Sequence, residues 1–261
     1  MAELVDAQVS EACPRERVEV RFFSSAPYQQ SWELRALSLN SFLLSDGIMR
    51  ETPNVRHQFI NALREHQAAF GVDLRDDTLN RLSNYYELIG EHNPILHLVG
   101  PCAPEEFAIR HILESLALLK HLPERAKFAD VGTGAGLPSM PCLLAREDLT
   151  AILIESKVKK ARFLTEAVSD LGLSSRAVVV NRQFEETDLG DAGYVTCRAL
   201  DKFTEKLPRL VKWAGGRTML LFGGHSLREA IQSAKLKASE ELLPMSDQRF
   251  LFVVNDKAPA N

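Results

Sequence analysis

The most informative stretch of the sequence reads Asp130-Val131-Gly132-Thr133-Gly134-Ala135-Gly136-Leu137-Pro138. It begins inside the apolar run 128–131, where a strand is expected to turn into a helix. Glycines at such a junction allow a tight turn and let a ligand approach backbone N–H groups at the helix N-terminus. Open α/β sheets bind ligands at this carboxyl edge. The stretch therefore predicts a site for a nucleotide-like ligand.

A carboxylate further along the chain narrows the choice between classes of ligand. Glu155 ends the next apolar run, nineteen residues after Gly136, and a carboxylate there can accept hydrogen bonds from both ribose hydroxyls. The glycine spacing G-x-G-x-G differs from the dinucleotide pattern G-x-G-x-x-G. Asp130 is available for a positively charged group, whereas the pyrophosphate of NAD would be repelled by it. These features favour S-adenosylmethionine over NAD; an exposed strand-end glutamate without a ligand is the alternative.

The pattern around this loop predicts the fold class. Short apolar runs occur at 128–131, 151–154, 177–180, 194–197, 218–222 and 250–254. Amphipathic stretches of helical length, such as 157–171 and 203–213, separate several of them. Strands that are apolar on both faces and alternate with helices indicate a parallel sheet covered on two sides. We predict an α/β fold with a mostly parallel, Rossmann-like sheet and helices on both faces.

Three regions are predicted along the chain. Residues 51–125 show helical patterns at 52–71, at 77–89 before Gly90 and Pro94, and from Pro104, so they are expected to form a helical N-terminal cap. Residues 126–261 form the ligand-binding core. Residues 1–50 are expected to be disordered or a mis-called N-terminal extension, because 1–7 and 18–22 reverse-translate to segments of a tRNA gene.

Composition excludes several classes of protein. The chain has 261 residues, of which 45% are hydrophobic and 25% charged, as in an ordinary globular protein. Its four cysteines are far apart and no histidines cluster at metal-ligand spacing, so neither a metal site nor a disulfide framework is predicted. No apolar run has the length of a membrane span. The net charge of -4 excludes coating of nucleic acid by bulk attraction, but not a local basic face. We expect a cytoplasmic protein.

The glycine loop and three further motifs resemble one family, the small-subunit (16S) ribosomal RNA guanine-N7 methyltransferases, also called glucose-inhibited division protein B. The motifs are Arg110-His111-Ile112-Leu113-Glu114-Ser115, the segment from Glu155-Ser156 to Leu164, and Cys197-Arg198-Ala199. The resemblance implies a class I methyltransferase fold and S-adenosylmethionine as cofactor. Together with the loop, it predicts cofactor contacts at Asp130, Gly132, Gly134, Gly136, Leu137, Glu155, Ser156, Phe184, Glu185 and Arg198.

Two segments depart from the family pattern. Where the family has W-N-x-x-x-N-L-T, this chain keeps only Asn93 and Leu98; where the family has L-K-G after the fifth strand, it has Phe222 in place of the lysine. A lysine expected near the RNA or the active site is therefore missing. The predicted substrate contacts are Asn93, Arg110, His111, Lys159 and Lys160. Asn93 and His111 have the alternative role of capping or joining helices.

The proposed chemistry needs no catalytic base, and none is assigned. Guanine N7 is unprotonated and carries an in-plane lone pair, so catalysis reduces to alignment and charge stabilisation. Basic residues after Glu155 and after Arg198 are expected to bind the phosphates of 16S ribosomal RNA or of the 30S subunit, unless they form a solvated helix face. We predict a monomer. The alternatives are a methyltransferase of a different substrate, a non-catalytic RNA-binding or assembly protein, and an NAD-binding oxidoreductase.

Overall fold

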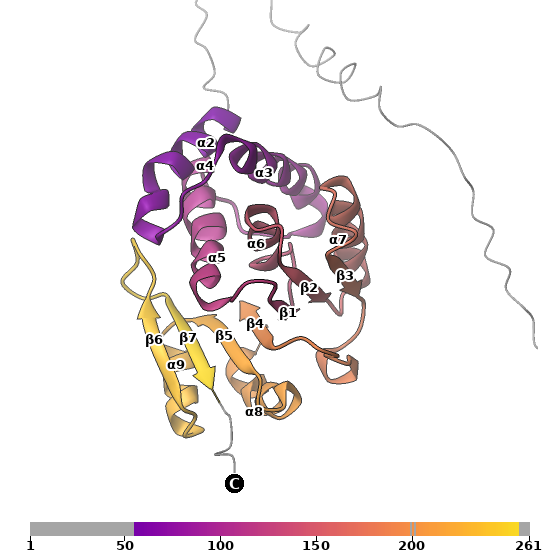
Figure 1. Ribbon diagram of the computed structural model, residues 1–261, viewed down its shortest axis with the longest axis vertical. Helices are drawn as coiled ribbons and strands as arrows, with labels where there is room; N and C mark the ends of the chain where they lie inside the picture. Colours follow the sequence, from indigo (N-terminus) through magenta and orange to yellow (C-terminus); the bar gives the residue numbers. More distant parts are fainter. Residues whose placement is uncertain (1–54, 199, 201, 256–261) are drawn as a thin grey trace, which may run out of the picture. The chain divides into compact units, whose positions relative to one another are not determined.

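A computed structural model of the chain describes residues 55–198, 200 and 202–255. The predicted extension 1–50 and the expected helix start at Thr52 and Pro53 lie outside these residues. The described residues form a seven-stranded sheet of order β3-β2-β1-β4-β5-β7-β6 (Figure 1). Neighbouring strands from β3 to β5 are parallel, and β7 and β6 continue the sheet antiparallel to β5 and β7, respectively. The predicted α/β class and mostly parallel sheet are confirmed.

The strand predictions agree with the structure to within one residue at each end. The strands are β1 Lys127–Val131, β2 Thr150–Ile154, β3 Ala177–Val180, β4 Tyr194–Arg198, β5 Thr218–Gly223, β6 Ala238–Leu242 and β7 Phe250–Asn255. Only β6 was not predicted among them. Its sequence, Ala-Ser-Glu-Glu-Leu, is almost entirely exposed because it forms the edge of the sheet, and an edge strand needs no apolar run.

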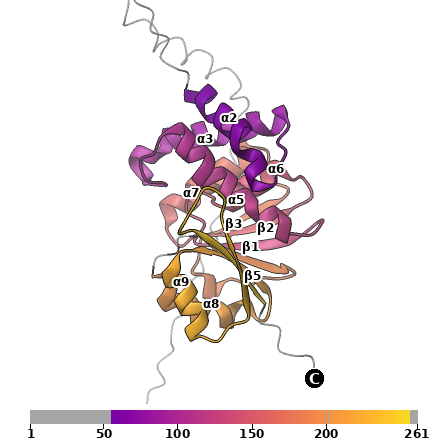
Figure 2. The same ribbon diagram turned by 90° about the vertical axis from the view of Figure 1, so that its left-hand side faces the viewer.

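Alternating residues of the strands build two separate cores on the two faces of the sheet. Phe128 and Leu153 face a cluster formed with the N-terminal helices, α6 (Ser139–Ala145) and α7 (Val158–Asp170). Ala129 and Ile154 face the opposite cluster, beneath α8 (Phe203–Ala214) and α9 (His225–Ser233). Figure 2 shows these two helical layers on opposite sides of the strands. The sheet is therefore covered on both faces, as its apolar strands require.

The N-terminal part is helical, and it packs into the same core as α6 and α7. Its segments are α2 Val55–His66, η1 Gln67–Phe70, α3 Asp76–Leu96, α4 Pro104–Phe107, η2 Ala108–Leu113, α5 Glu114–Leu116 and η3 Ala117–His121. The boundary predicted at 125–126 thus marks a change of chain pattern within one hydrophobic cluster.

The predicted end of the second helix at Gly90 was wrong. Helix α3 continues through Gly90 and Pro94 to Leu96. A side chain at Gly90 would meet open space, so this glycine lies on an unpacked side of the helix, where its cost of about 1 kcal/mol is tolerated. Pro94 falls in the last turn, and the helix ends where His97 adopts a left-handed conformation and donates its N–H to the Asn93 carbonyl at 3.0 Å.

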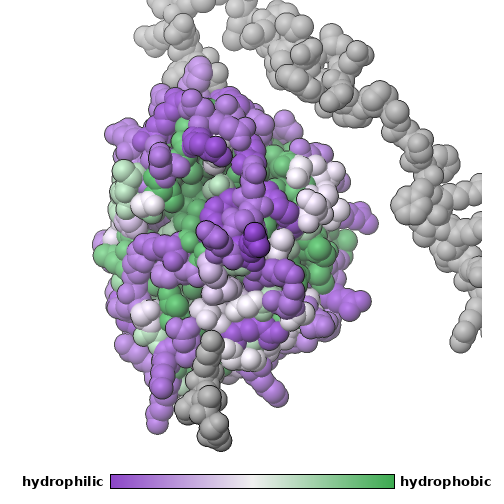
Figure 3. Space-filling model, in the orientation of Figure 1, coloured by the Kyte–Doolittle hydropathy of each residue, from purple (hydrophilic) through white to green (hydrophobic). Residues whose placement is uncertain are grey.

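The face of the molecule seen in Figure 3 is a mosaic of hydrophilic residues with separate apolar patches. Among the described residues, every helix is too short or too polar to cross a membrane.

Candidate functional site

A cavity of about 540 Å³ lies at the carboxyl ends of β1, β2 and β4, above the glycine loop. It is lined by Leu98, Val99, Gly100, His111, Gly132, Thr133, Gly134, Ala135, Leu137, Glu155, Ser156, Lys157, Lys160, Gln183, Arg198, Leu200 and Lys206. Six of the ten predicted cofactor contacts are therefore brought together around one space. Two of the predicted substrate residues, His111 and Lys160, line the same space.

The glycine loop has a backbone that other residues would strain. Gly132 has φ +68°, and a Cβ atom there would lie 2.7 Å from the Leu200 side chain. Gly136 has φ +99°, and its Cβ would lie 2.3 Å from Cγ of Met140. The loop is tied to β2 because the Gly132 N–H donates to the Ile154 carbonyl at 2.9 Å. Gly136 therefore serves loop-to-helix packing and does not line the cavity, although it was predicted as a cofactor contact.

Asp130 also lies beneath the loop and not at the cavity surface. Its carboxyl is fully buried, and Oδ2 accepts hydrogen bonds from the hydroxyls of Thr133 at 2.7 Å and Ser139 at 2.6 Å. Burial raises the pKa of Asp130 to about 7, against the lowering effect of these hydrogen bonds. Asp130 thus holds the loop in place through hydrogen bonds on its buried side. Its side chain does not line the cavity, where a positively charged group could contact it.

Glu155 directly follows β2 and lies at the first cavity. Only 6% of the residue is exposed, yet it lines the cavity. Its Oε2 accepts the Gly134 N–H at 3.1 Å, and its Oε1 accepts the Lys157 N–H at 2.8 Å. A carboxylate has about four acceptor positions on its two oxygens. Each oxygen therefore keeps one position for a ligand hydroxyl, while the backbone bonds fix the direction of the carboxylate.

His111 belongs to a helical segment with wider turns. Residues Ala108–Leu113 form a π-helix, a form often found at functional sites. The imidazole packs edge-on against Phe107, with 4.8 Å between ring centroids, and its Nδ1 is buried without a hydrogen-bond partner among the described residues. Burial and then the nearby Arg198 lower the pKa of His111 to about 4. A neutral imidazole with one unsatisfied nitrogen therefore lines the cavity.

Arg198, at the end of β4, is anchored by the helical segment that contains Arg110 and Glu114. Its guanidinium donates to the Arg110 carbonyl and to Oε2 of Glu114, the latter at 3.1 Å. The Glu114 carboxylate is 1% exposed, and its Oε1 accepts a hydrogen bond from Nε of Arg249 at 2.6 Å. One buried carboxylate thus holds two guanidinium groups, which offsets its cost of burial. Glu114 and Arg249 were not predicted, although Glu114 lies in a quoted motif.

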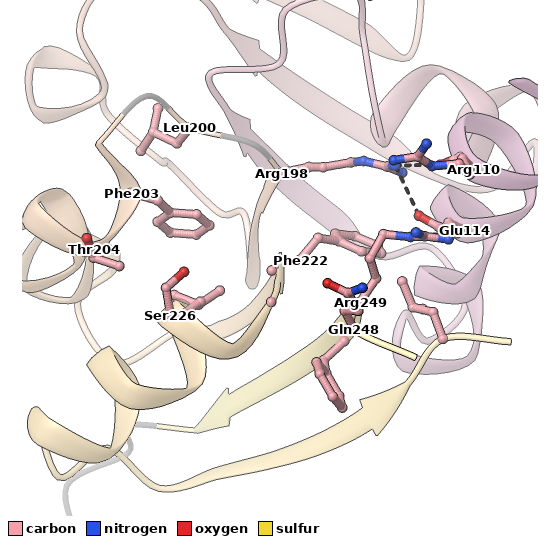
Figure 4. A pocket seen from close by; sticks show the side chains of 15 residues that line it. Arg110, Glu114, Arg198, Leu200, Phe203, Thr204, Phe222, Ser226, Gln248 and Arg249 are labelled. Carbon is pink, nitrogen blue, oxygen red and sulfur yellow. Dashed lines mark hydrogen bonds and ion pairs between the residues drawn. The ribbon is translucent and has the colours of Figure 1, made fainter. Parts of the chain in front are cut away.

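A second cavity, of 550 Å³, adjoins this network (Figure 4). Phe203, Phe222 and Phe250 line it together with Arg110, Glu114 and Arg249, and it shares Arg198 and Leu200 with the first cavity. Arg110 was predicted as a substrate residue, and it lies here with its guanidinium paired to Glu106.

Phe222 occupies the position where the resemblance led us to expect a lysine. The Arg198 guanidinium lies over its ring, 5.5 Å from the centroid. Arg249, which directly precedes β7, brings a positive charge to the same cavity from the antiparallel part of the sheet.

Besides Asp130 and Gly136, four further predicted residues line neither cavity. Phe184 is buried against Trp213, and Glu185 pairs with Arg209 at 3.2 Å; the preceding residue, Gln183, lines the first cavity instead. The Asn93 amide exchanges two hydrogen bonds with the Val99 backbone, both at 3.0 Å, which is the alternative role of joining a helix end to a loop. Lys159 is exposed on α7.

The strand order, with five parallel strands and an antiparallel hairpin at one edge, and the loop-and-carboxylate cavity at the carboxyl ends of β1 and β2 define a Rossmann-like, class I methyltransferase. Residues 78–253 match the GidB family, described as "rRNA small subunit methyltransferase G". The chain belongs to this family of small-subunit ribosomal RNA methyltransferases. Membership confirms the predicted enzyme class, its ribosomal RNA substrate and its cofactor, S-adenosylmethionine.

Two relatives named as methyltransferases of this family agree with the assignment. The chain is 35% identical over 146 residues to ribosomal RNA small subunit methyltransferase G of Acinetobacter baylyi, covering 55% of this chain and 68% of the relative. It is 33% identical over 153 residues to the protein of that name from Neisseria meningitidis, covering 59% of this chain and 72% of the relative. Among solved structures, it is similar to the METTL16 MTase domain, with 13% identity, a TM-score of 0.48, and coverage of 80% of this chain and 94% of that chain.

Proposed function

We propose that this chain transfers a methyl group from S-adenosylmethionine to N7 of a guanine in 16S ribosomal RNA, with the cofactor bound in the first cavity. The observation that carries the proposal is the meeting of the glycine loop, Glu155, Ser156 and Arg198 around one space of 540 Å³, a size typical of ligand sites. The family match supplies the reaction class.

The residues present fit this cofactor. The Glu155 carboxylate keeps acceptor positions for the two ribose hydroxyls, and Gly134 leaves its side of the loop open, since a Cβ there would meet only the Gly132 carbonyl at 3.8 Å. Lys206 and Arg198 line the cavity and suit the carboxylate of the methionine part. The buried, unpartnered Nδ1 of His111 offers one more polar contact.

When bound, S-adenosylmethionine supplies an electrophilic methyl group on its sulfonium. The guanine N7 lone pair forms the new N–C bond as the C–S bond breaks and its electron pair passes to sulfur. No proton has to leave N7, so the chain needs no general base. Its residues hold the two partners in line, exclude water and neutralise shifting charge. The guanine ring becomes positively charged, and the site that holds it must accommodate this charge.

The test is methylation by the full chain of 30S subunits and, separately, of free 16S RNA with radiolabelled S-adenosylmethionine. Borohydride reduction followed by aniline treatment then cleaves RNA at 7-methylguanine. We expect label in the RNA and one cleavage position. Label without cleavage would show a different acceptor atom, and cofactor binding without label would indicate a non-catalytic RNA-binding protein.

The same preparations address the partner and the assembly state. We propose that the protein acts in the cytoplasm, because ribosomal RNA is the substrate of the family, and that it acts as a monomer. Light scattering with and without the cofactor should give the mass of one chain. A stable dimer would contradict this.

A further inference from the structure

The two cavities adjoin, which restricts where the acceptor can lie. Arg198 and Leu200 line both, and the neighbouring residues Arg110 and His111 line one each. Methyl transfer requires the reacting atoms to approach to about 3–3.5 Å. With the donor in the first cavity, the acceptor must therefore occupy a space that meets it at this shared wall, and the second cavity does so.

The lining of the second cavity suits a flat ring. Phe203 comes from the start of α8 and Phe222 from the end of β5, and Figure 4 shows both rings at the cavity between α9 and the Arg198–Glu114 pair. Enzymes that modify a base inside RNA or DNA take it out of the stack and hold it among aromatic and apolar side chains. Stacking on an aromatic side chain contributes about 1–3 kcal/mol per base.

The charges of the cavity suit the polar edge of a guanine. The Arg198 guanidinium already lies over the Phe222 ring, 5.5 Å from its centroid, and only 5% of Phe222 is exposed, so the half-buried Phe203 supplies the ring surface that is free for stacking. Glu114 neutralises part of the charge of Arg198 and Arg249. Arg249 uses Nε for this ion pair, and its side chain is 34% exposed, which leaves its outer N–H groups available as donors.

We propose that the second cavity holds the acceptor guanine, extruded from the RNA, with its ring against Phe203 and its O6 accepting a hydrogen bond from Arg249. This assignment rests on the proposed function. It gives a reason for selecting guanine, because adenine presents an N–H donor where guanine presents the O6 acceptor, and a guanidinium has only donors. Arg249 and Phe203 are then substrate-binding residues, and Glu114 is a positioning residue for Arg249.

A binding experiment tests the pocket independently of methyl transfer. The full chain saturated with S-adenosylhomocysteine is titrated with GMP, AMP and 7-methyl-GMP, and binding is followed by NMR. We expect GMP and 7-methyl-GMP, which share the O6 acceptor, to bind more tightly than AMP. Phe203→Leu should weaken binding of all three nucleotides by about 5-fold or more through the loss of stacking, and Phe203→Tyr should retain it. Arg249→Met should abolish the preference for GMP over AMP.

Phe252→Leu is the matched control, because Phe252 lies two residues along β7 from Phe250 and lines neither cavity. Each variant is first shown to be folded by circular dichroism and to bind S-adenosylhomocysteine as the wild type does. Equal affinities for the three nucleotides, or a preference for GMP over AMP that survives Arg249→Met, would overturn the pocket assignment. Normal nucleotide preferences without methylation of 30S subunits or 16S RNA would instead overturn the proposed function and leave the pocket assignment standing.

Discussion

The Tyr85 hydroxyl donates a hydrogen bond to the backbone carbonyl of Ala135 at 2.9 Å. Tyr85 is fully buried on α3, and Ala135 lies in the glycine loop, so this bond connects the N-terminal helices directly to the wall of the first cavity. The N-terminal helices therefore do more than cover one face of the sheet, because they help to fix the loop on which the cofactor is proposed to lie.

Replacing Tyr85 by phenylalanine should remove this connection with little change of volume. The buried Ala135 carbonyl would lose a partner, so the free energy of unfolding should fall by about 0.5–1.5 kcal/mol, and cofactor affinity should fall with it. Urea unfolding and calorimetry measure the two effects. Tyr86→Phe is the control, because the Tyr86 hydroxyl has no hydrogen bond to a described residue; equal effects of the two variants would contradict this role.

Glu155→Ala should weaken binding of S-adenosylmethionine. A hydrogen bond to a charged group contributes about 1.5–3 kcal/mol, so loss of the ribose contact and of the bond to the Gly134 N–H should raise Kd by about 10- to 100-fold or more. Calorimetric titration measures this. Glu166→Ala removes an exposed carboxylate from α7 and should leave Kd unchanged. Unaltered affinity of Glu155→Ala would remove Glu155 from the cofactor site.

Asp130 makes stability depend on pH. Its pKa is raised from 3.8 to about 7 in the folded protein, so between these values the folded state keeps a proton that the unfolded state has lost. This contribution to the free energy of unfolding is largest below pH 4 and falls as pH rises toward 7, at up to about 1.4 kcal/mol per pH unit. Denaturant unfolding measures the free energies of unfolding of the wild type and of Asp130→Asn. The difference between the two should become smaller as pH rises from 4 toward 7. A constant difference would contradict the raised pKa.

His111 should make the free energy of unfolding depend on pH in the opposite direction. Its pKa is lowered from 6.5 to about 4, so between these values the unfolded state binds a proton that the folded state does not. Its contribution is fully present above pH 6.5 and is lost as pH falls toward 4. The imidazole resonances of His111 should titrate near pH 4 in the NMR spectrum and disappear in His111→Asn. His57→Asn is the matched control, because the same substitution is made at an exposed histidine; it should leave the His111 resonances and the stability profile unchanged. Titration of His111 near pH 6.5 would contradict its burial.

Lys159 should bind RNA phosphate without touching the cofactor. It is exposed on α7, beside Lys160, whose ammonium donates to the His97 carbonyl at 3.2 Å. Lys159→Glu should weaken RNA binding and reduce the slope of log K against log salt by about 0.7 for a single-stranded contact. Lys237→Glu is the control, because Lys237 is exposed at the opposite edge of the sheet, next to Asn255. Equal slopes for wild type and Lys159→Glu would remove Lys159 from the interface.

The sequence predicted those features that depend on local pattern. The strands β1 to β5 and β7 are apolar because both faces of the sheet are covered, so their runs were recognisable. Gly132 and Glu155 were predicted to contact the cofactor from their positions in the sequence. A glycine in the turn after the first strand is suited to a positive φ, and a carboxylate at the end of the next strand is placed to meet a ligand at the same edge of the sheet. The continuation of α3 past Gly90 was missed because propensity is a weak guide once tertiary packing holds a helix.

The remaining features depend on contacts between distant parts of the chain. Glu114 and Arg249 are 135 positions apart, and only the fold shows that they form an ion pair. The inward direction of the Asp130 carboxyl likewise depends on Thr133 and Ser139, which can donate to it only once the loop has formed. A carboxylate beside a glycine loop can face either way, and its sequence position does not distinguish the two.

The shared wall between the cavities has a thermodynamic consequence. Arg198 lines both spaces and is held through Glu114 and the Arg110 carbonyl, so a shift of its guanidinium on one side alters the donors offered on the other. With the cofactor and the acceptor base in the two cavities as proposed, any factor by which one ligand changes the affinity of the other applies equally in the reverse direction.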